Sequence, residues 1–383
     1  MSGFVSMIIA AAGLGLLILV HEFGHYLTAK ILGIRVEEFS VGFGRYLVSR
    51  RWGETVYGIS LVPLGGYVRV TGMHEEDFQA RVDAVRGSAE SRKDAESRIT
   101  GASAIGNAEV AETPPERRYY LRPVWQRITF ISSGVFMNVV AAFVLMLLVA
   151  VFGYYQPTTT IEQVEKDSPA HIAGIEAGDQ ILGVAGERVN KWQEAQETIL
   201  DHPQEDVEIL IERGGTELIL RARLDTRQEG QGGYLGVAPG VEKMHPGPGA
   251  SVRFAAERTY ALFAMTVQGI SMMITGEAEV TGEGGIAGPV GIVSMSSQAV
   301  KGGYFLSLLA FISVQLSILN MLPLLPLDGG HVAVNLVEKV LGRRVSLKTF
   351  ESVSMVGIAL FLFLVVVATG NDVGRLLSGG FGP

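Results

Sequence analysis

Residues 4–25 read FVSMIIAAAGLGLLILVHEFGH, and this stretch decides the fold. Its apolar part, residues 4–20, carries no charge and forms a helix of about 25 Å, which covers most of the hydrocarbon core of a bilayer. An H-E-x-x-H motif follows directly, with His21 and His25 on one helix face where both imidazoles can bind one zinc ion, and with Glu22 as a general base. The sequence thus predicts a metal site at the end of a membrane-spanning helix. The alternative is polar side chains that only reach from the helix end toward water.

The composition of the 383 residues fits a chain with both membrane and soluble parts. Hydrophobic residues make up 48% and charged residues 18%, which is more apolar than an average soluble protein. The chain has no cysteine, so a metal site must use His, Asp or Glu, and disulfides are excluded. The net charge of −8 argues against a nucleic acid as partner.

Four apolar segments predict transmembrane helices. They are residues 4–32, 128–155, 304–327 and 353–369. A further uncharged segment, residues 259–276, contains Thr, Gln, Ser and Gly and follows several charged residues. This pattern predicts an amphipathic helix at the membrane interface.

Basic residues predict the orientation, because loops rich in Lys and Arg stay in the cytoplasm. Such residues follow the first helix, precede the second and follow the third: Lys30, Arg35, Arg45, Arg50, Arg51, Arg117, Arg118, Arg122, Arg127, Lys339, Arg343, Arg344 and Lys348. The long segment between the second and third helices is then extracytoplasmic, as are both termini. The first and third helices run in the same direction, so their C-terminal ends can share one site.

The third apolar segment ends in NMLPLLPLDGGH, residues 320–331. An Asp at the end of a long apolar run is costly unless it faces a partner, and catalytic zinc usually has three protein ligands. Asp328 is therefore the natural third ligand, although it can instead cap the helix that follows the prolines. His331 is a rival ligand that we rank lower. Asn320 can hydrogen-bond a substrate backbone or the oxyanion, or simply join two helices.

The two motifs, in this order, resemble those of the site-2 proteases, which are intramembrane zinc metalloproteases. The likeness is to bacterial regulators of intramembrane proteolysis with a single PDZ domain, of the actinobacterial type, and it covers nearly the whole chain except residues 75–115. The resemblance implies Zn²⁺ as cofactor and assigns its ligands as His21, His25 and Asp328. It also implies that Glu22 is the general base and that Asn320 helps to hold the substrate.

Residues 35–70 are rich in β-branched and aromatic residues with interspersed Gly, a pattern typical of a β-hairpin. The resemblance implies a β-loop that re-enters the membrane beside the active site, with four glycines as substrate-binding residues: Gly42, Gly44, Gly65 and Gly66. An exposed strand edge can hold an unwound substrate by β-addition. The alternative is a cytoplasmic sheet without a role in substrate binding. Residues 75–115, rich in Ala, Glu, Arg and Ser, predict a flexible cytoplasmic insert or a loose helix.

Residues 158–239 resemble a PDZ domain, through the segments SPA at 168–170, AGI at 173–175 and GDQIL at 178–182. The candidate peptide-binding loop precedes the strand that would pair with a peptide: Tyr234, Leu235, Gly236 and Val237. The alternative is a steric filter that binds nothing tightly.

We therefore expect a polytopic α-helical membrane protein with four transmembrane helices, a membrane-associated β-hairpin loop and an inserted α/β PDZ domain. The expected domains are transmembrane helix 1 with the first motif (1–34), the β-loop (35–73), a flexible cytoplasmic insert (74–122), transmembrane helix 2 (123–156), the extracytoplasmic PDZ domain (157–241), a linker with the amphipathic helix (242–300), transmembrane helix 3 with the second motif (301–331), and a cytoplasmic loop with transmembrane helix 4 (332–383).

The function implied by the resemblance is cleavage of transmembrane segments of single-pass proteins in the bacterial inner membrane, with the active site toward the cytoplasm. Anti-sigma factors and remnant signal peptides are the implied substrates, and the lipid bilayer is a partner. The main alternative is a non-proteolytic PDZ scaffold with a structural metal site, which needs four protein ligands. A metal transporter is less well supported, because the membrane segments contain few further polar residues.

Overall fold

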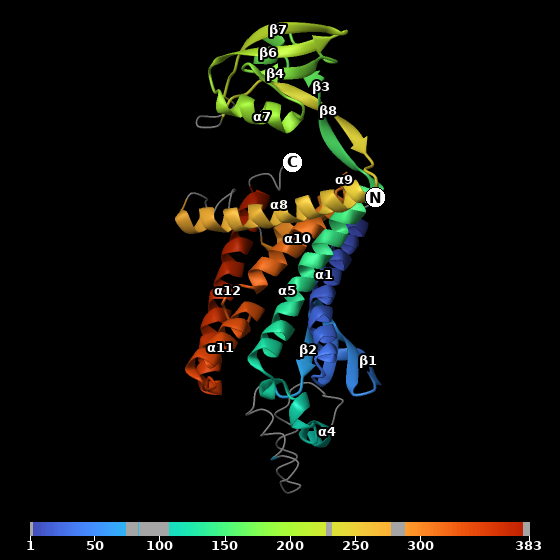
Figure 1. The fold of residues 1–383 in the computed structure, drawn as a ribbon, viewed down its shortest axis with the longest axis vertical. Coiled ribbons are helices and arrows are strands. Elements are labelled where there is room, and N and C mark those ends of the chain that lie inside the picture. Colours follow the sequence, from blue (N-terminus) through green and yellow to red (C-terminus); the bar gives the residue numbers. More distant parts are fainter. Residues whose placement is uncertain (1–2, 74–82, 84–106, 227–231, 277–287, 378–383) are drawn as a thin grey trace. The chain divides into compact units, whose positions relative to one another are not determined.

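The computed structural model describes residues 3–73, 83, 107–226, 232–276 and 288–377 (Figure 1). The chain divides into two compact units. One contains Met1–Leu148 with Val252–Pro383, and the other contains Val149–Ser251. Most of the insert expected between the first two transmembrane helices, residues 74–82 and 84–106, lies outside the described residues.

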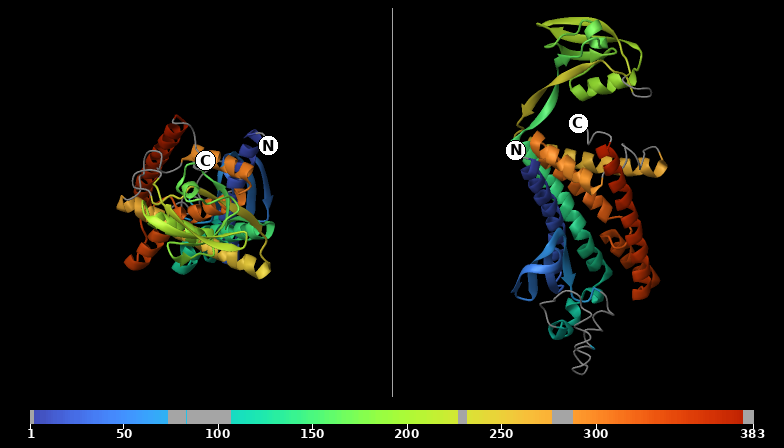
Figure 2. Two further views of the ribbon diagram at one scale, coloured as in Figure 1. Left: turned by 90° about the horizontal axis from the view of Figure 1, so that it is seen from above. Right: turned by 180° about the vertical axis from the view of Figure 1, so that it is seen from behind.

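The first unit is mainly helical. Its longer helices are α1 (Gly3–Ile31), α5 (Val124–Phe152), α8 (Pro248–Thr275), α9 (Pro289–Gly302), α10 (Phe305–Asn320), α11 (Asp328–Leu341) and α12 (Leu347–Leu377). Figures 1 and 2 show α1, α5, α10 and α12 running alongside one another, while α8 lies across their ends. Small and apolar residues of α5, α8 and α10 form one buried cluster: Ala142, Met146, Ala255, Ala310 and Val314. The sequence did not predict α9, which packs against α1, α10 and α12.

Three of the described helices are long and apolar enough to cross a membrane, at Ile8–Ile31, Val124–Phe152 and Lys348–Arg375. The fourth expected span, residues 304–327, is not confirmed as a helix of this length, because the prolines at 323 and 326 interrupt it, as the sequence indicates. Its helix α10 ends at Asn320 after 16 residues, which corresponds to a length of about 24 Å. The chain then turns before α11, since proline lacks the amide proton and the space that a continuing helix requires.

The second long helix also ends earlier than expected. The predicted span reached residue 155, but α5 ends at Phe152, and Gly153 adopts a φ of 86° that favours glycine. Strand β3 begins directly afterwards, at Tyr154. The β-structure therefore begins three residues before the expected domain boundary at residue 157.

The predicted hairpin is formed by β1 (Val36–Trp52) and β2 (Thr55–Val70), which are antiparallel. Both strands bend, so that Val41 pairs with Gly66 on one side and with Ile59 on the other. The N-terminal part of β1 is therefore flanked on both sides by parts of β2. This brings the C-terminal end of β2 back toward α1, against which it packs.

Residues 107–121, which were expected to belong to the flexible insert, form ordered structure. They contain α4 (Asn107–Ala111) and two short 3₁₀ turns. The amides of Tyr119 and Tyr120 donate to the carbonyls of Thr71 and Gly72, at 2.9 and 3.0 Å. Both tyrosine side chains are buried, because they pack into the apolar clusters beside the hairpin.

The second unit contains a six-stranded sheet in the order β7-β6-β4-β3-β8, with β5 paired to β4. Its elements are β3 (Tyr154–Val164), α6 (Pro169–Ile172), β4 (Gln180–Val184), β5 (Glu187–Arg188), α7 (Trp192–Asp201), β6 (Asp206–Arg213), β7 (Thr216–Arg223) and β8 (Val237–Met244). The unit has its own hydrophobic core. The strand β8 lies at one edge of the sheet, so its outer side is not paired with any strand among the described residues of this unit.

Candidate metal centre

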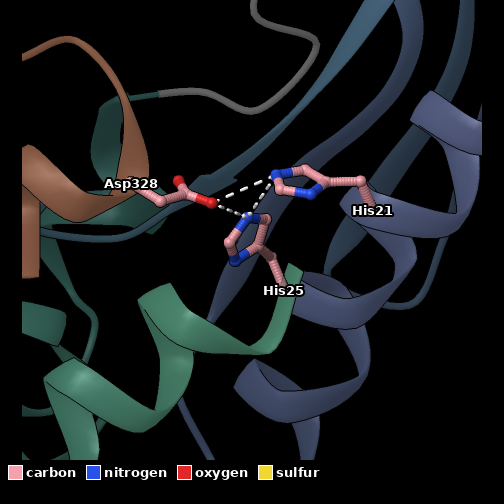
Figure 3. Close-up of side chains that lie close together, drawn as sticks. All are labelled: His21, His25 and Asp328. Carbon is pink, nitrogen blue, oxygen red and sulfur yellow. Dashed lines mark hydrogen bonds and ion pairs between the residues drawn. The ribbon is translucent and has the colours of Figure 1, made fainter. Parts of the chain in front are cut away.

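Three predicted ligands meet at one point, and we call them the His-His-Asp cluster: His21, His25 and Asp328. The two histidines project from α1, and the aspartate is the first residue of α11 (Figure 3). Asp328 Oδ2 lies 3.1 Å from His21 Nε2 and 3.3 Å from His25 Nε2, and the two Nε2 atoms are 3.3 Å apart. Both histidines are buried, with 8% and 7% of their surface exposed.

The hydrogen bonds around the cluster indicate that a cation belongs at its centre. His25 Nδ1 lies 2.9 Å from the carbonyl oxygen of Phe130, and because a carbonyl only accepts, Nδ1 carries a proton. In the neutral ring, Nε2 then presents its lone pair to Asp328 Oδ2, which is also an acceptor. Apart from the imidazoles, no described residue gives Oδ2 a hydrogen bond. A positive charge between these atoms resolves their repulsion.

The spacing and the chemistry of these three groups fit zinc. Ligand atoms about 2.0–2.1 Å from one tetrahedral zinc ion lie about 3.3 Å from one another, close to the observed separations of 3.1–3.3 Å. Two imidazoles and one carboxylate are a typical donor set for catalytic zinc and leave one coordination position open. Among the described residues, the cluster has three members. His331 is not one of them, and its ring packs 5.4 Å from that of Phe350.

The predicted base Glu22 lies between the metal ligands and the hairpin. Its carboxylate is within electrostatic reach of all three members of the His-His-Asp cluster. A Cβ atom added to Gly66 of β2 would lie 3.0 Å from Glu22 Cγ and 2.8 Å from the carbonyl oxygen of Ser40. The backbone of β2 therefore runs directly beside the Glu22 side chain, and only glycine leaves room for this approach.

The other predicted substrate-binding residues of the first unit are less directly connected to the cluster. Gly42, Gly44 and Gly65 all have positive φ values, which indicates a role in the bends of the hairpin. Asn320 is the last residue of α10. In the described part of the chain, no hydrogen bond or ion pair joins Asn320 to the His-His-Asp cluster.

The predicted peptide-binding loop of the second unit is only partly available to a ligand. Leu235 is 2% exposed and belongs to the hydrophobic core, so its side chain cannot contact a peptide. Tyr234 donates a hydrogen bond to the carboxylate of Glu165. A hollow of about 350 Å³ lies along β3 and the start of β8, lined by Gln163, Val164, Glu165, Tyr234, Gly236, Val237 and Ala238.

Asp328 is held in place by two contacts that sequence reasoning missed. Arg127 of α5 forms an ion pair with Glu338 of α11 at 2.7 Å, and both side chains are nearly buried. Asn335 of α11 donates to the hydroxyl of Tyr119 at 3.2 Å. These contacts hold α11 beside the N-terminal end of α5. Their partners are more than 200 positions apart in the chain, so no local pattern reveals them.

A third missed feature is the contribution of α5 to the cluster itself. Besides the carbonyl of Phe130, the side-chain amide of Asn138 reaches the cluster, 3.2 Å from His21 Nδ1. Gly134 lies between them in the sequence, and a Cβ atom there would be 2.4 Å from His25 Nε2. The signal available in the sequence was the spacing of positions 130, 134 and 138, which places them on one helix face.

Comparison with known proteins identifies relatives over most of the chain. The family model of peptidase family M50 matches residues 9–364. The zinc metalloprotease RasP of Bacillus licheniformis is 28% identical over 416 residues, covering 94% of this chain and 97% of that protein. The regulator of sigma-W protease RasP of Bacillus subtilis is 26% identical, covering 97% and 99%. Among solved structures, the PDZ domain of an SdrC-like protein from Listeria monocytogenes is 20% identical, with a TM-score of 0.20, and covers 22% of this chain and 87% of its own.

Proposed function

The chain belongs to peptidase family M50, so it is an intramembrane zinc metalloprotease, and on this premise we propose that His21, His25 and Asp328 hold the zinc ion. The observation that carries this assignment is the convergence of their three ligand atoms within 3.3 Å of one another. We further propose that Glu22 is the catalytic base. Its position next to His21 in the motif and its reach toward the cluster support this role.

Several residues of the chain have separate roles in peptide hydrolysis. Zinc bound here supplies Lewis acidity, which makes water a better nucleophile and stabilises negative charge on the carbonyl oxygen. Glu22 accepts the proton of the attacking water and delivers it to the amide nitrogen that leaves. Gly66 leaves room for the Glu22 side chain beside the backbone of β2. Asn320, at the end of α10, is proposed to hydrogen-bond the substrate backbone.

The proposed substrates are single-pass membrane proteins, cleaved within or near their transmembrane helix. A helix shields its own amides, so the substrate must be extended at the site of cleavage. The strand β2 runs beside Glu22 at Gly66 and can hold an extended segment through its backbone groups. The name of the Bacillus subtilis relative, a regulator of sigma-W protease, supports anti-sigma factors as one substrate class. Remnant signal peptides are a second class.

The proposed location is the bacterial inner membrane, with the PDZ-like unit outside the cytoplasm and the active site toward the cytoplasm. The basic residues near the hairpin and around the α11–α12 junction support this orientation. The proposal includes α10 as a fourth, shorter crossing and α8 as an interfacial helix. The orientation of α8 across the ends of α1, α5 and α10 supports the latter role (Figures 1 and 2).

A glutamine at position 22 tests the proposed function. Glu22→Gln keeps the shape of the side chain and removes the base, so cleavage of a single-pass reporter in proteoliposomes should fall by about 10²–10⁴-fold. Zinc content, measured by mass spectrometry, should stay at one ion per chain, because the side chain at position 22 is not a ligand. Glu257→Gln, on the exposed face of α8, is the matched control and should cleave normally. Undiminished cleavage by Glu22→Gln would rule out the base assignment.

The non-proteolytic scaffold is less well supported than the protease. A structural zinc site is closed by four protein ligands, whereas the described residues supply three here. The rival fourth ligand, His331, packs against Phe350 instead. The open position favours a site that admits water and substrate.

A further inference from the structure

One face of α5 lines the proposed metal site. Phe130, Gly134 and Asn138 follow one another at intervals of four residues, so they lie along a single stripe of the helix. Phe130 offers its carbonyl to His25, and Asn138 offers its side-chain amide to His21. Gly134, between them, leaves the space that the two imidazoles occupy. The stripe therefore contacts both rings, at Nδ1 through Phe130 and Asn138 and beside Nε2 through Gly134.

The Phe130 carbonyl sets the tautomer of His25. Since the carbonyl only accepts, the proton of the neutral ring is on Nδ1, and Nε2 keeps the lone pair that a metal ion requires. Because the acceptor is a backbone carbonyl, this hydrogen bond does not depend on which side chain stands at position 130. His21 has no such carbonyl among its described partners, and its Nδ1 is 3.2 Å from the side chain of Asn138.

The orientation of the Asn138 amide decides the tautomer of His21. The amide can present either its nitrogen or its oxygen, because the two orientations have the same shape. If the nitrogen faced His21, Nδ1 would accept and Nε2 would carry the proton, which would block its lone pair. If the oxygen faces His21, Nδ1 donates and Nε2 is free. The structure places Nδ2 beside His21, and Oδ1 of this fully buried side chain has no described hydrogen-bond partner, so only the contact with His21 distinguishes the two orientations of the amide.

We propose that Asn138 is a positioning residue for the metal site: with its amide turned so that Oδ1 takes the place of Nδ2 beside His21, the oxygen accepts the Nδ1 proton and thereby directs Nε2 toward the point that His25 and Asp328 also face. The inference rests on the proposed function, in which His21 is a zinc ligand through Nε2. It gives α5 a role in metal binding, although α5 belongs to neither of the two sequence motifs. Partners of this kind typically change metal affinity by 10–100-fold.

Two substitutions of similar size test this role. Asn138→Leu keeps the volume and removes the acceptor, so the zinc affinity of the purified protein, measured by competition with a chelator, should fall by about 10–100-fold. Asn138→Asp keeps an oxygen acceptor and cannot donate, so its affinity should stay within a few-fold of the wild type. Thermal unfolding of the metal-free variants shows whether each one is folded. The inference is overturned if Asn138→Leu binds zinc as tightly as the wild type, or if a folded Asn138→Asp loses as much affinity as Asn138→Leu.

A measurement on the wild-type protein does not depend on a folded variant. Nitrogen-15 NMR of labelled histidine side chains should show zinc shifting Nε2 of His21 while Nδ1 keeps its proton, with the signal assigned by its loss in His21→Gln. Binding through Nδ1 would overturn the inference, because the Asn138 oxygen would then have no proton to accept. A wild-type protein that binds no zinc would instead overturn the proposed function itself.

Discussion

At the scale of single residues, two glycines allow α1 and α5 to approach closely at the cluster. A Cβ atom on Gly24, inside the HEFGH motif, would lie 2.5 Å from the carbonyl oxygen of Ser133. A Cβ atom on Gly134 would lie 2.4 Å from His25 Nε2 and 2.8 Å from His21 Nε2. Glycine inside a helix costs about 1 kcal/mol relative to alanine, so its use at both facing positions has a steric reason. The approach brings the α5 backbone within reach of the imidazoles.

Alanine at position 134 should therefore impair metal binding more than folding. The added methyl group would overlap the ligand nitrogens, and one imidazole would have to move away from the point that Asp328 faces. We expect Gly134→Ala to lower zinc affinity by at least about 10-fold in the same chelator competition. Gly15→Ala is the control, since nothing lies within 4 Å of a Cβ atom there. Equal zinc affinity in the two variants would show that the site tolerates the methyl group.

At the scale of helices, the position of Asp328 depends on how α11 is held. The aspartate is the first residue of this helix, so any tilt of α11 moves its carboxylate relative to α1. The ion pair of Arg127 with Glu338 connects α11 to α5, and its two side chains are 11% and 12% exposed. A nearly buried pair is costly to break, because the remaining charge has no partner and little water.

Single substitutions in this ion pair should be more harmful than a double substitution. Arg127→Met leaves the Glu338 carboxylate without its countercharge and with only the Val345 amide as a donor, which should cost about 3–5 kcal/mol of unfolding free energy in detergent, and should also weaken zinc binding. Replacing both residues by Met removes both charges and should be less destabilising. Arg253→Met, in an exposed pair on α8, should change stability by less than about 1 kcal/mol. A double variant as unstable as the sum of the singles would contradict this account.

At the scale of the whole molecule, the two units have separate cores, and the second is stabilised by a charge network of its own. Asp179 is 1% exposed and accepts two hydrogen bonds from Arg213, both at 2.7 Å, and one from the backbone amide of Glu176. The bonds from Arg213 lower the pKa of Asp179, against the opposing effect of burial. The ionised carboxylate therefore favours the folded state.

The stability of the second unit should depend on pH through Asp179. Because its folded pKa lies below the unfolded value of about 3.9, its contribution is complete above that value and is lost as the pH falls through the folded pKa. Asp179→Asn should lower stability at pH 7 by about 2 kcal/mol and reduce the loss in acid. In a Trp52→Phe, Trp125→Phe background, denaturant titrations followed by the fluorescence of Trp192, which packs on this core, report on this unit alone. An acid transition unchanged by Asp179→Asn would exclude this role.

Local sequence patterns were enough to predict the class of the protein and its metal chemistry. HEFGH at the end of an apolar run, followed much later by Asp328 after a proline-broken run, indicated the metal ligands before any geometry was known. Local patterns sufficed for this, because helical spacing pairs His21 with His25 and the cost of a charge at membrane depth requires a partner for Asp328. The β-hairpin was likewise predicted from its residue types.

The assembly of the site depends on contacts that are visible only in the three-dimensional structure. The ordered segment before α5, the ion pair of Arg127 with Glu338 and the contact of Asn138 with His21 depend on residues far apart in the chain. A single sequence carries no record of such contacts, since hydropathy and spacing describe only what lies within one helix or strand. The motifs supply the side chains that can bind zinc. The packing of α5 and α11 against α1 brings the lone pairs of these side chains to one point.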